Sequence, residues 1–273
     1  MCRWIAYSGT PIYLHEALFE PEHSLIDQSL RAKSSETTTN GDGFGIGWYN
    51  KREFPGVFKD VRPAWNDGNL QALSQQIRAS LFFAHVRAAT TGAVQRSNCH
   101  PFCHENWLFV HNGAIDDYEK IRRDLLFAVA PELFNSIEGT TDSELMFYLA
   151  LTFGMAGDVE SGLARMAGFV ESVGEKHGIE HPLQMTLGVS DGESLYAVRY
   201  SSARESRTLF HSKDPEALED VTPEADRVSS KTVAVVSEPL SSLAGAWQEV
   251  PESSFLTIAG GKVQHEHFEP RRP

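Results

Sequence analysis

The sequence predicts a layered α+β fold in a single domain that covers residues 2–273. Short apolar or alternating runs of strand length occur near both ends of the chain, and three helical patterns with one apolar stripe lie between them. No internal repeat, low-complexity block or long linker divides the chain. We therefore expect the two ends of the chain to share a sheet.

The first part of the chain is predicted to contain two strands. Residues 2–7, C-R-W-I-A-Y, are rich in β-branched and aromatic types and are closed by a Ser-Gly pair. A helical pattern around Leu25 and Leu30 follows, and then a polar loop at residues 34–43. Residues 43–49 alternate glycine with large apolar residues, which predicts a strand with one bare face open to close approach.

Buried strands and helices are expected in the middle of the chain. The apolar runs at residues 81–86 and 107–110 have strand length. Three helices follow, with apolar stripes that include Tyr118, Leu145 and Leu163, and the third is expected to stop at Gly178.

The last third of the chain alternates again and is predicted to be mostly β-structure. Residues 183–200 read as a hairpin around an Asp-Gly turn. Further strands are expected at residues 207–210, 231–236, 255–258 and 262–267. The acidic, turn-rich segment 213–227 is expected to be a solvated surface excursion.

The composition excludes several classes of protein. A formal net charge of −13 opposes a phosphate backbone or an anionic membrane surface, so neither nucleic acid nor membrane is expected as a partner. No apolar run approaches the ~20 residues of a spanning helix, and a secretory signal pattern is missing. Three cysteines are too few for a disulfide framework and suit a reducing compartment. We expect a soluble, cytoplasmic protein.

Cys2 is the first candidate catalytic residue. It directly follows Met1, and cysteine is small enough for an aminopeptidase to remove that methionine. Removal leaves a thiol and a free α-amine on one residue. Because an α-amine titrates at about 7.7 to 8.0, it can take the thiol proton near neutral pH. A buried structural cysteine at the start of a strand is the alternative.

Two further segments offer groups that suit amide chemistry. An apolar strand ends at Arg87, whose guanidinium can hold a carboxylate through two hydrogen bonds while Thr90 adds a hydroxyl donor. A surface ion pair is the alternative. The Asn112 side chain and the Gly113 N–H could form an oxyanion hole, although Asn-Gly is also a strong turn signal.

A fourth segment, G-T-T-D-S-E at residues 139–144, opens one of the expected helices. Thr141 and Glu144 have the spacing of a capping box. Asp142 is either an acid favoured by the helix dipole or a group that binds a substrate ammonium, and the spacing leaves both open.

In their order along the chain, these four segments resemble the class II glutamine amidotransferase domain, a family of N-terminal nucleophile hydrolases. In that family an N-terminal cysteine precedes an H-x-R-x-A-T type segment, then H-N-G, then T-D-S-E, as here from Cys2 to Glu144. The S-E-P-L segment at residues 237–240 is also similar to the family. The opening C-R-W and N-G-D-G-F-G-I-G-W resemble stand-alone members, some of which are thought to hydrolyse γ-glutamyl amides in thiol or glutathione metabolism.

The resemblance implies a four-layer αββα sandwich that cleaves the γ-amide of glutamine through a thioester and releases ammonia. No metal and no cofactor are implied, and the ammonia could pass to a partner protein. The residues it assigns are Cys2 as nucleophile, Asn112 and Gly113 for the oxyanion, Arg87 and Thr90 for the α-carboxylate, Asp142 for the α-ammonium and His111 on the substrate side.

Some positions depart from the synthetic branches of the family. Arg3 follows the nucleophile where those branches commonly carry glycine, and Ala88 and Thr91 stand where the sugar-phosphate branch has Trp and His. These changes weaken the expectation of an ammonia-accepting partner. A self-sufficient γ-glutamyl amide or peptide hydrolase is therefore the alternative, and a non-catalytic amino-acid-binding protein on the same fold is another.

Two other patterns are discounted. The cluster C-H-x-x-C-H, formed by Cys99, His100, Cys103 and His104, matches no standard zinc spacing, and neighbours on an extended strand face opposite sides. The glycines of G-D-G-F-G-I-G lack the G-x-G-x-x-G spacing and no βαβ unit follows, which excludes a dinucleotide loop. The H-P-F segment at residues 100–102 is similar to one in stand-alone amidotransferases and is expected in the wall of the site.

Overall fold

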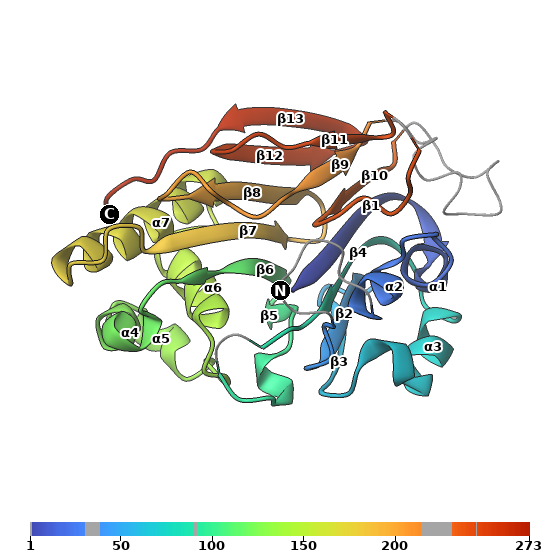
Figure 1. Cartoon of the computed structure of the whole chain (residues 1–273), viewed down its shortest axis with the longest axis horizontal. Helices are drawn as coiled ribbons and strands as arrows, with labels where there is room; N and C mark the ends of the chain where they lie inside the picture. Colours follow the sequence, from blue (N-terminus) through green and yellow to red (C-terminus); the bar gives the residue numbers. More distant parts are fainter. Residues whose placement is uncertain (1, 31–38, 90–91, 214–230, 244) are drawn as a thin grey trace.

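The structure is a computed structural model that describes residues 2–30, 39–89, 92–213, 231–243 and 245–273 (Figure 1). Within these residues the strands form two antiparallel sheets. Residues 34–38 of the predicted loop and residues 214–227 of the predicted excursion lie outside the described residues.

The first sheet has seven strands in the order β11-β9-β10-β1-β4-β2-β3. Their bounds are β1 (Arg3–Tyr13), β2 (Phe44–Tyr49), β3 (Gly56–Asp60), β4 (Arg78–Val86), β9 (Phe210–Ser212), β10 (Val233–Val236) and β11 (Trp247–Glu249). Val86 pairs with both Arg3 and Phe44, so the starts of β1 and β2 and the end of β4 lie side by side at the same end of the sheet. The first strand is longer than predicted, because the Ser-Gly pair forms an irregularity within it rather than its end.

The second sheet has six strands in the order β13-β12-β8-β7-β6-β5. Their bounds are β5 (Phe102–His104), β6 (Trp107–Ile115), β7 (Leu183–Ser190), β8 (Leu195–Ser201), β12 (Ser254–Ala259) and β13 (Lys262–His267). The predicted hairpin is confirmed as β7–β8. The expectation that the two ends of the chain share a sheet is wrong, because β1 lies in the first sheet and β12–β13 close the second. Residue pattern identifies strands but does not specify their partners.

The helices divide between the two sheets (Figure 1). The helices on the first sheet are α1 (Leu14–Leu18), α2 (Leu25–Leu30) and α3 (Gly68–Ser74), and those on the second are α4 (Tyr118–Phe127), α5 (Pro131–Phe134), α6 (Asp142–Thr152) and α7 (Val159–Lys176). Short 3-10 turns occupy Ala64–Asn66 and Arg96–Asn98. The three predicted helices are α4, α6 and α7. The single apolar stripe predicted for α6 is wrong, since its residues 142–150 are all buried.

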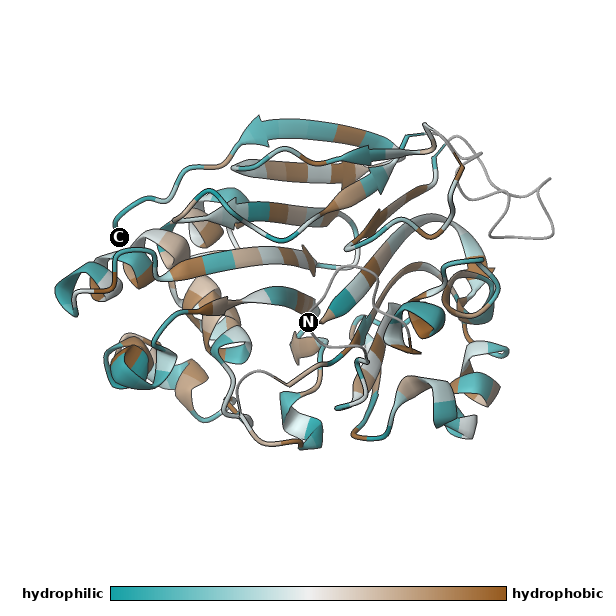
Figure 2. Cartoon of the chain, in the orientation of Figure 1, coloured by the Kyte–Doolittle hydropathy of each residue, from teal (hydrophilic) through white to brown (hydrophobic). Residues whose placement is uncertain are grey.

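Alternation along β1 shows how the layers are held together. Ile5 and Tyr7 enter the apolar core beneath α1–α3, whereas Trp4 and Ala6 enter the core between the two sheets. A third core joins the second sheet to α4–α7. These three cores create four layers, which confirms the predicted αββα sandwich. Figure 2 shows apolar residues on the inner strands and a mostly hydrophilic β13, whose outward side is an exposed edge.

Among the described helices none is long and apolar enough to cross a membrane. The three cysteines are all free thiols.

Candidate active site

The space between the sheets receives the side chains of two residues predicted to carry chemistry, Cys2 and Asn112. Cys2 directly precedes β1 and stands two residues before Trp4, which packs between the sheets, so strand alternation directs its side chain to the same face. Its Sγ lies 3.5 Å from the carbonyl oxygen of Ala88. On β6, Leu108 and Val110 face the same space, so alternation also directs Asn112 into it. The Cys2 thiol and the Asn112 side-chain amide are therefore both directed into the space between the two sheets.

The predicted oxyanion pair lies inside strand β6 rather than in a turn. β7 pairs with β6 from Leu108 to Ile115, but β5 covers the other edge only as far as Phe109. The Ile115 N–H points to that open edge, where it donates to Asp142 Oδ2 at 2.9 Å. Because alternate N–H groups of a strand point the same way, the Gly113 N–H also faces the open edge. An oxyanion donor requires this orientation.

A further hydrogen bond supports this assignment of the edge. His85 Nε2 on β4 donates to the carbonyl oxygen of His111 at 3.3 Å. The His111 carbonyl group therefore points to the open edge of β6. The Asn112 carbonyl accepts from Thr186 Oγ1 at 3.1 Å on the β7 side. Successive residues of β6 thus alternate between a partner strand and the open edge.

The side chain of His111 is not brought to the Cys2 face. It lies on the helix side of β6, where Nδ1 is 2.8 Å from Ser143 Oγ on α6 and the ring is 1% exposed. Burial lowers the pKa of His111. A Cβ added to Gly113 would lie 2.6 Å from His111 Nε2. The His111 ring therefore lies beside Gly113 on the face of β6 opposite to the Asn112 side chain.

Arg87 directly follows β4 and lies on the same side as the inter-sheet residue Phe83. It is buried and donates through Nη1 to the carbonyl oxygen of Ala93 at 3.3 Å. Asp42 fixes the backbone around it, because the Asp42 N–H donates to the Arg87 carbonyl at 3.0 Å and its Oδ2 accepts from the Ala89 N–H at 2.8 Å. Thr90 lies outside the described residues.

Asp142 opens α6 and is buried against the open edge of β6. Besides the Ile115 N–H, its carboxylate accepts the Ser143 N–H at 2.7 Å and the Ser143 hydroxyl at 3.1 Å. Thr141 caps the helix by accepting from the Glu144 N–H. The reciprocal half of the predicted capping box is missing, because the Glu144 carboxylate accepts from the N–H groups of Glu138 and Gly139 instead.

Charges on both sides act on the Cys2 thiol. Burial has the largest effect and raises its pKa, while Arg87 lowers the pKa and Asp142 raises it. The thiol is therefore protonated at neutral pH in the chain that begins with Met1, and a nearby base is needed to activate it.

The bare face predicted for residues 43–49 packs closely against the H-P-F segment. A Cβ added to Gly45 would lie 2.1 Å from the His100 carbonyl oxygen, and one added to Gly47 would lie 2.7 Å from Pro101. These glycines admit residues 100–101 between the sheets beside His85, whose ring centroid is 4.1 Å from that of His100. Cys99 and His100 are buried and Cys103 is exposed. The described residues hold no group of three or more His, Cys, Asp or Glu side chains arranged for a metal.

Two contributors to the site were not predicted. One is Asp42, which appeared only as part of a loop, and the other is Glu238 of the S-E-P-L segment, which forms an ion pair with Arg3. The family-like segments around both were the available signal.

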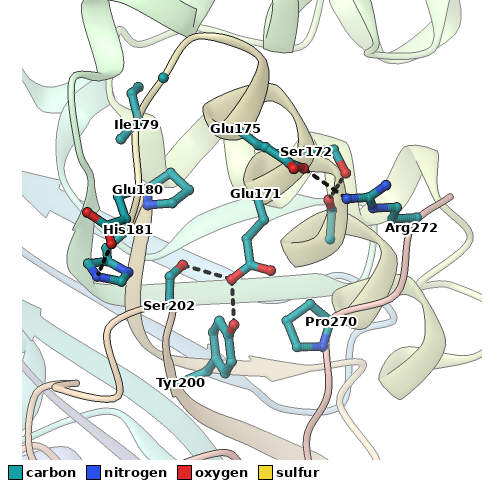
Figure 3. Close-up of a pocket in the computed structure, with 13 residues that line it drawn as sticks. Glu171, Ser172, Glu175, Ile179, Glu180, His181, Tyr200, Ser202, Pro270 and Arg272 are labelled. Atoms are coloured by element: carbon teal, nitrogen blue, oxygen red, sulfur yellow. Dashed lines mark hydrogen bonds and ion pairs between the residues drawn. The ribbon is translucent and has the colours of Figure 1, made fainter.

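A cavity of about 720 Å³ lies elsewhere, between α7, the segment that precedes β7, the end of β8 and the C-terminal tail (Figure 3). Its acidic side chains already have partners. Tyr200 and Ser202 both donate to Glu171, and Glu175 forms an ion pair with Arg272. No residue predicted for catalysis or binding lines this cavity.

The αββα layers and a cysteine at the start of a central strand define the fold class of the N-terminal nucleophile hydrolases. A glutamine phosphoribosylpyrophosphate amidotransferase from B. subtilis has this fold, with a TM-score of 0.67 at 14% identity over 99% of this chain and 50% of that one. A family model described as class-II glutamine amidotransferases matches residues 20–272. The chain belongs to the class II glutamine amidotransferases, a family of enzymes.

Individual relatives are similar over most of their length. The probable glutamine amidotransferase DUG3 of Saccharomyces cerevisiae is 32% identical over 94% of this chain and 82% of its own. The gamma-glutamyl-hercynylcysteine sulfoxide hydrolase of Mycolicibacterium smegmatis is 24% identical over 96% of this chain and 98% of its own. A solved glutamine aminotransferase class-II domain protein from Silicibacter pomeroyi has a TM-score of 0.77 and 32% identity, covering 99% of this chain and 100% of that one.

Proposed function

We propose that this protein hydrolyses the amide at the γ-carbonyl of a glutamyl group, with the Cys2 thiol as nucleophile after removal of Met1. One observation carries the proposal. Cys2 and Asn112 face the same space between the sheets, and the Gly113 N–H points to the open edge of β6 beside it.

The chemistry follows from these groups. The Cys2 α-amine takes the thiol proton, and the sulfur attacks the γ-carbon to give a tetrahedral intermediate. The Asn112 amide and the Gly113 N–H donate to its negative oxygen. The C–N bond then breaks, the α-amine returns the proton to the leaving nitrogen, and a thioester remains on Cys2. Water attacks the thioester and restores the thiol with release of the glutamyl carboxylate.

Recognition of the amino acid head group is assigned to the two charges beside the thiol. Arg87, with Thr90, is proposed to hold the α-carboxylate, and Asp142 the α-ammonium. Both side chains are buried and act electrostatically on Cys2, which supports their proximity to the reacting atoms. A buried arginine provides the fork geometry that suits a carboxylate.

Two leaving groups are considered. Ammonia leaves if the substrate is glutamine, either into water or to an accepting partner protein. A larger amine leaves if the substrate is a γ-glutamyl amide or peptide. The match to the mycobacterial hydrolase over nearly the full length of both chains favours this second candidate.

The free thiols and the lack of a spanning helix among the described residues support a cytoplasmic location.

Mass spectrometry after incubation with the diazoketone analogue of glutamine tests the nucleophile. A single adduct is expected on an N-terminal Cys2 that has lost Met1. Cys103 serves as an internal control, because it is the exposed thiol and reports nonspecific alkylation. An adduct on Cys103 alone, or activity that survives the change Cys2→Ala, would refute the assignment. Ammonia release from glutamine and amine release from γ-glutamyl peptides, measured in parallel, distinguish the two substrates. Binding without release of either indicates a non-catalytic binding protein.

A further inference from the structure

Arg3 is buried on the face of β1 opposite to the predicted nucleophile. It shares this face with Ile5 and Tyr7, which pack beneath α1–α3, and its side chain is 2% exposed. The guanidinium is therefore separated from the space between the sheets by the strand itself. A substrate bound beside Cys2 would not touch it.

The Arg3 guanidinium nevertheless holds the nucleophile through the backbone. Nη1 donates to the carbonyl oxygen of Cys2 at 2.9 Å, and Nη2 forms an ion pair with Glu238 Oε1. The Glu238 side chain is 14% exposed, so the pair is largely shielded from water. One planar group thus connects the backbone of residue 2 to a carboxylate from the other end of the chain.

The segment that carries Glu238 is itself fixed to β1. The Ser237 N–H donates to the Trp4 carbonyl at 3.0 Å, and the Trp4 N–H donates to Ser237 Oγ at 3.1 Å. The Glu238 carbonyl accepts from Gln28 on α2 at 3.4 Å. Glu238 therefore offers Arg3 a rigid partner.

We propose that Arg3 and Glu238 form a positioning pair for the nucleophile, which rests on the proposed role of Cys2. After Met1 is removed, no preceding peptide holds Cys2 in place. The Arg3 bond fixes the plane of the Cys2–Arg3 peptide and thereby the Cys2 Cα, which carries both the α-amine and the thiol. Misplacement of reacting atoms by about 1 Å can cost about 10²-fold in rate. The pair gives a physical reason for arginine at a position where the synthetic branches commonly carry glycine.

The variants Arg3→Lys and Glu238→Gln test the pair. Lysine keeps the charge but lacks the fork that reaches both partners, and glutamine keeps the size but not the charge. Release of p-nitroaniline from γ-glutamyl-p-nitroanilide gives kcat and KM, and labelling to completion with the diazoketone analogue counts the active sites. This count converts the measured rate into kcat per active site, that is, per Cys2 thiol that the analogue is able to label. We expect this kcat to fall about 10- to 100-fold while KM stays within about 2-fold.

Arg199→Lys is the matched control. The Arg199 side chain is 11% exposed and also bonds a glutamate and a backbone carbonyl, Glu249 and Val250. It lies on β8, two strands from Asn112, and its hydrogen bonds and ion pairs among the described residues reach neither Cys2 nor Glu238. Its kcat per labelled site is expected to stay at the wild-type value.

The inference is overturned if both test variants keep wild-type kcat per labelled site, including the case in which only the number of labelled sites falls. That outcome is distinct from failure of the proposed function. If wild-type Cys2 cannot be labelled, or if Cys2→Ala keeps its turnover, the nucleophile itself has been assigned wrongly.

Discussion

At the scale of single residues, Gly113 shows how local geometry limits what the site can carry. A Cβ at this position would lie 2.0 Å from the Gln184 carbonyl oxygen on β7 and 2.6 Å from His111 Nε2. Since backbone of the partner strand cannot yield, β6 would have to shift and carry the Gly113 N–H with it. The sequence indicated Asn-Gly as a turn or an oxyanion pair, and only the pairing of β6 with β7 distinguishes them.

We predict that Gly113→Ala lowers kcat by about 10²- to 10³-fold, the usual cost of losing one oxyanion donor. KM should change little, because the donor acts on charge that develops during the reaction. Steady-state kinetics on the protein that remains folded checks this. Gly157→Ala is the control, since its added Cβ meets no atom closer than 3.7 Å. Wild-type kcat in a folded Gly113→Ala protein would exclude this N–H as an oxyanion donor.

At the scale of elements, the bare face of β2 determines how the wall of the site is built. The alternation of glycine with large residues predicted both the strand and the close approach. What approaches is the His100 carbonyl group and the Pro101 ring, which the sequence suggested only as part of the wall. Strands β3, β5 and β11 were not predicted, because short strands with few apolar residues are recognised mainly through their neighbours.

We expect Gly45→Ala to lower the free energy of unfolding by about 1–3 kcal/mol, because the added methyl group would overlap the His100 carbonyl oxygen and push strand and wall apart. Urea unfolding of the wild-type protein and of the Gly45→Ala variant measures this difference in the free energy of unfolding. Gly68→Ala is the matched control. No atom lies within 4 Å of its added Cβ, and Gly68 begins α3, so this change is expected to be neutral or slightly stabilising. Equal losses for both variants would contradict the packing argument.

At the scale of the whole molecule, the two sheets bury histidines that must stay neutral. Burial lowers the pKa of His85 to about 3 and that of His100 well below its usual value. In the unfolded chain both groups titrate near 6.5. The fold therefore favours the neutral form, so its stability is complete above about pH 6.5 and is lost as the pH falls from there toward 3.

We predict a decline in the free energy of unfolding below pH 6.5 of up to about 1.4 kcal/mol per pH unit for each of these histidines. Urea unfolding between pH 7.5 and pH 5 tests this, in a range where few carboxylates titrate. His85→Gln should reduce the slope, whereas His181→Gln should not, because the His181 side chain is 53% exposed. Stability that stays constant across this range would show that these rings are hydrated in solution.

The sequence by itself determined the α+β class, most of the longer strands and helices, and the family-like segments around Cys2, Arg87, Asn112 and Asp142, because these depend on local pattern and on residue type. It did not determine which sheet each end of the chain joins, because a strand's pattern records a buried face but not its partner. Only the tertiary structure decided the open edge of β6, the direction of the His111 ring and the pairing of Arg3 with Glu238. Each of these depends on contacts between segments far apart in the chain, and such contacts leave no periodic trace in either segment alone.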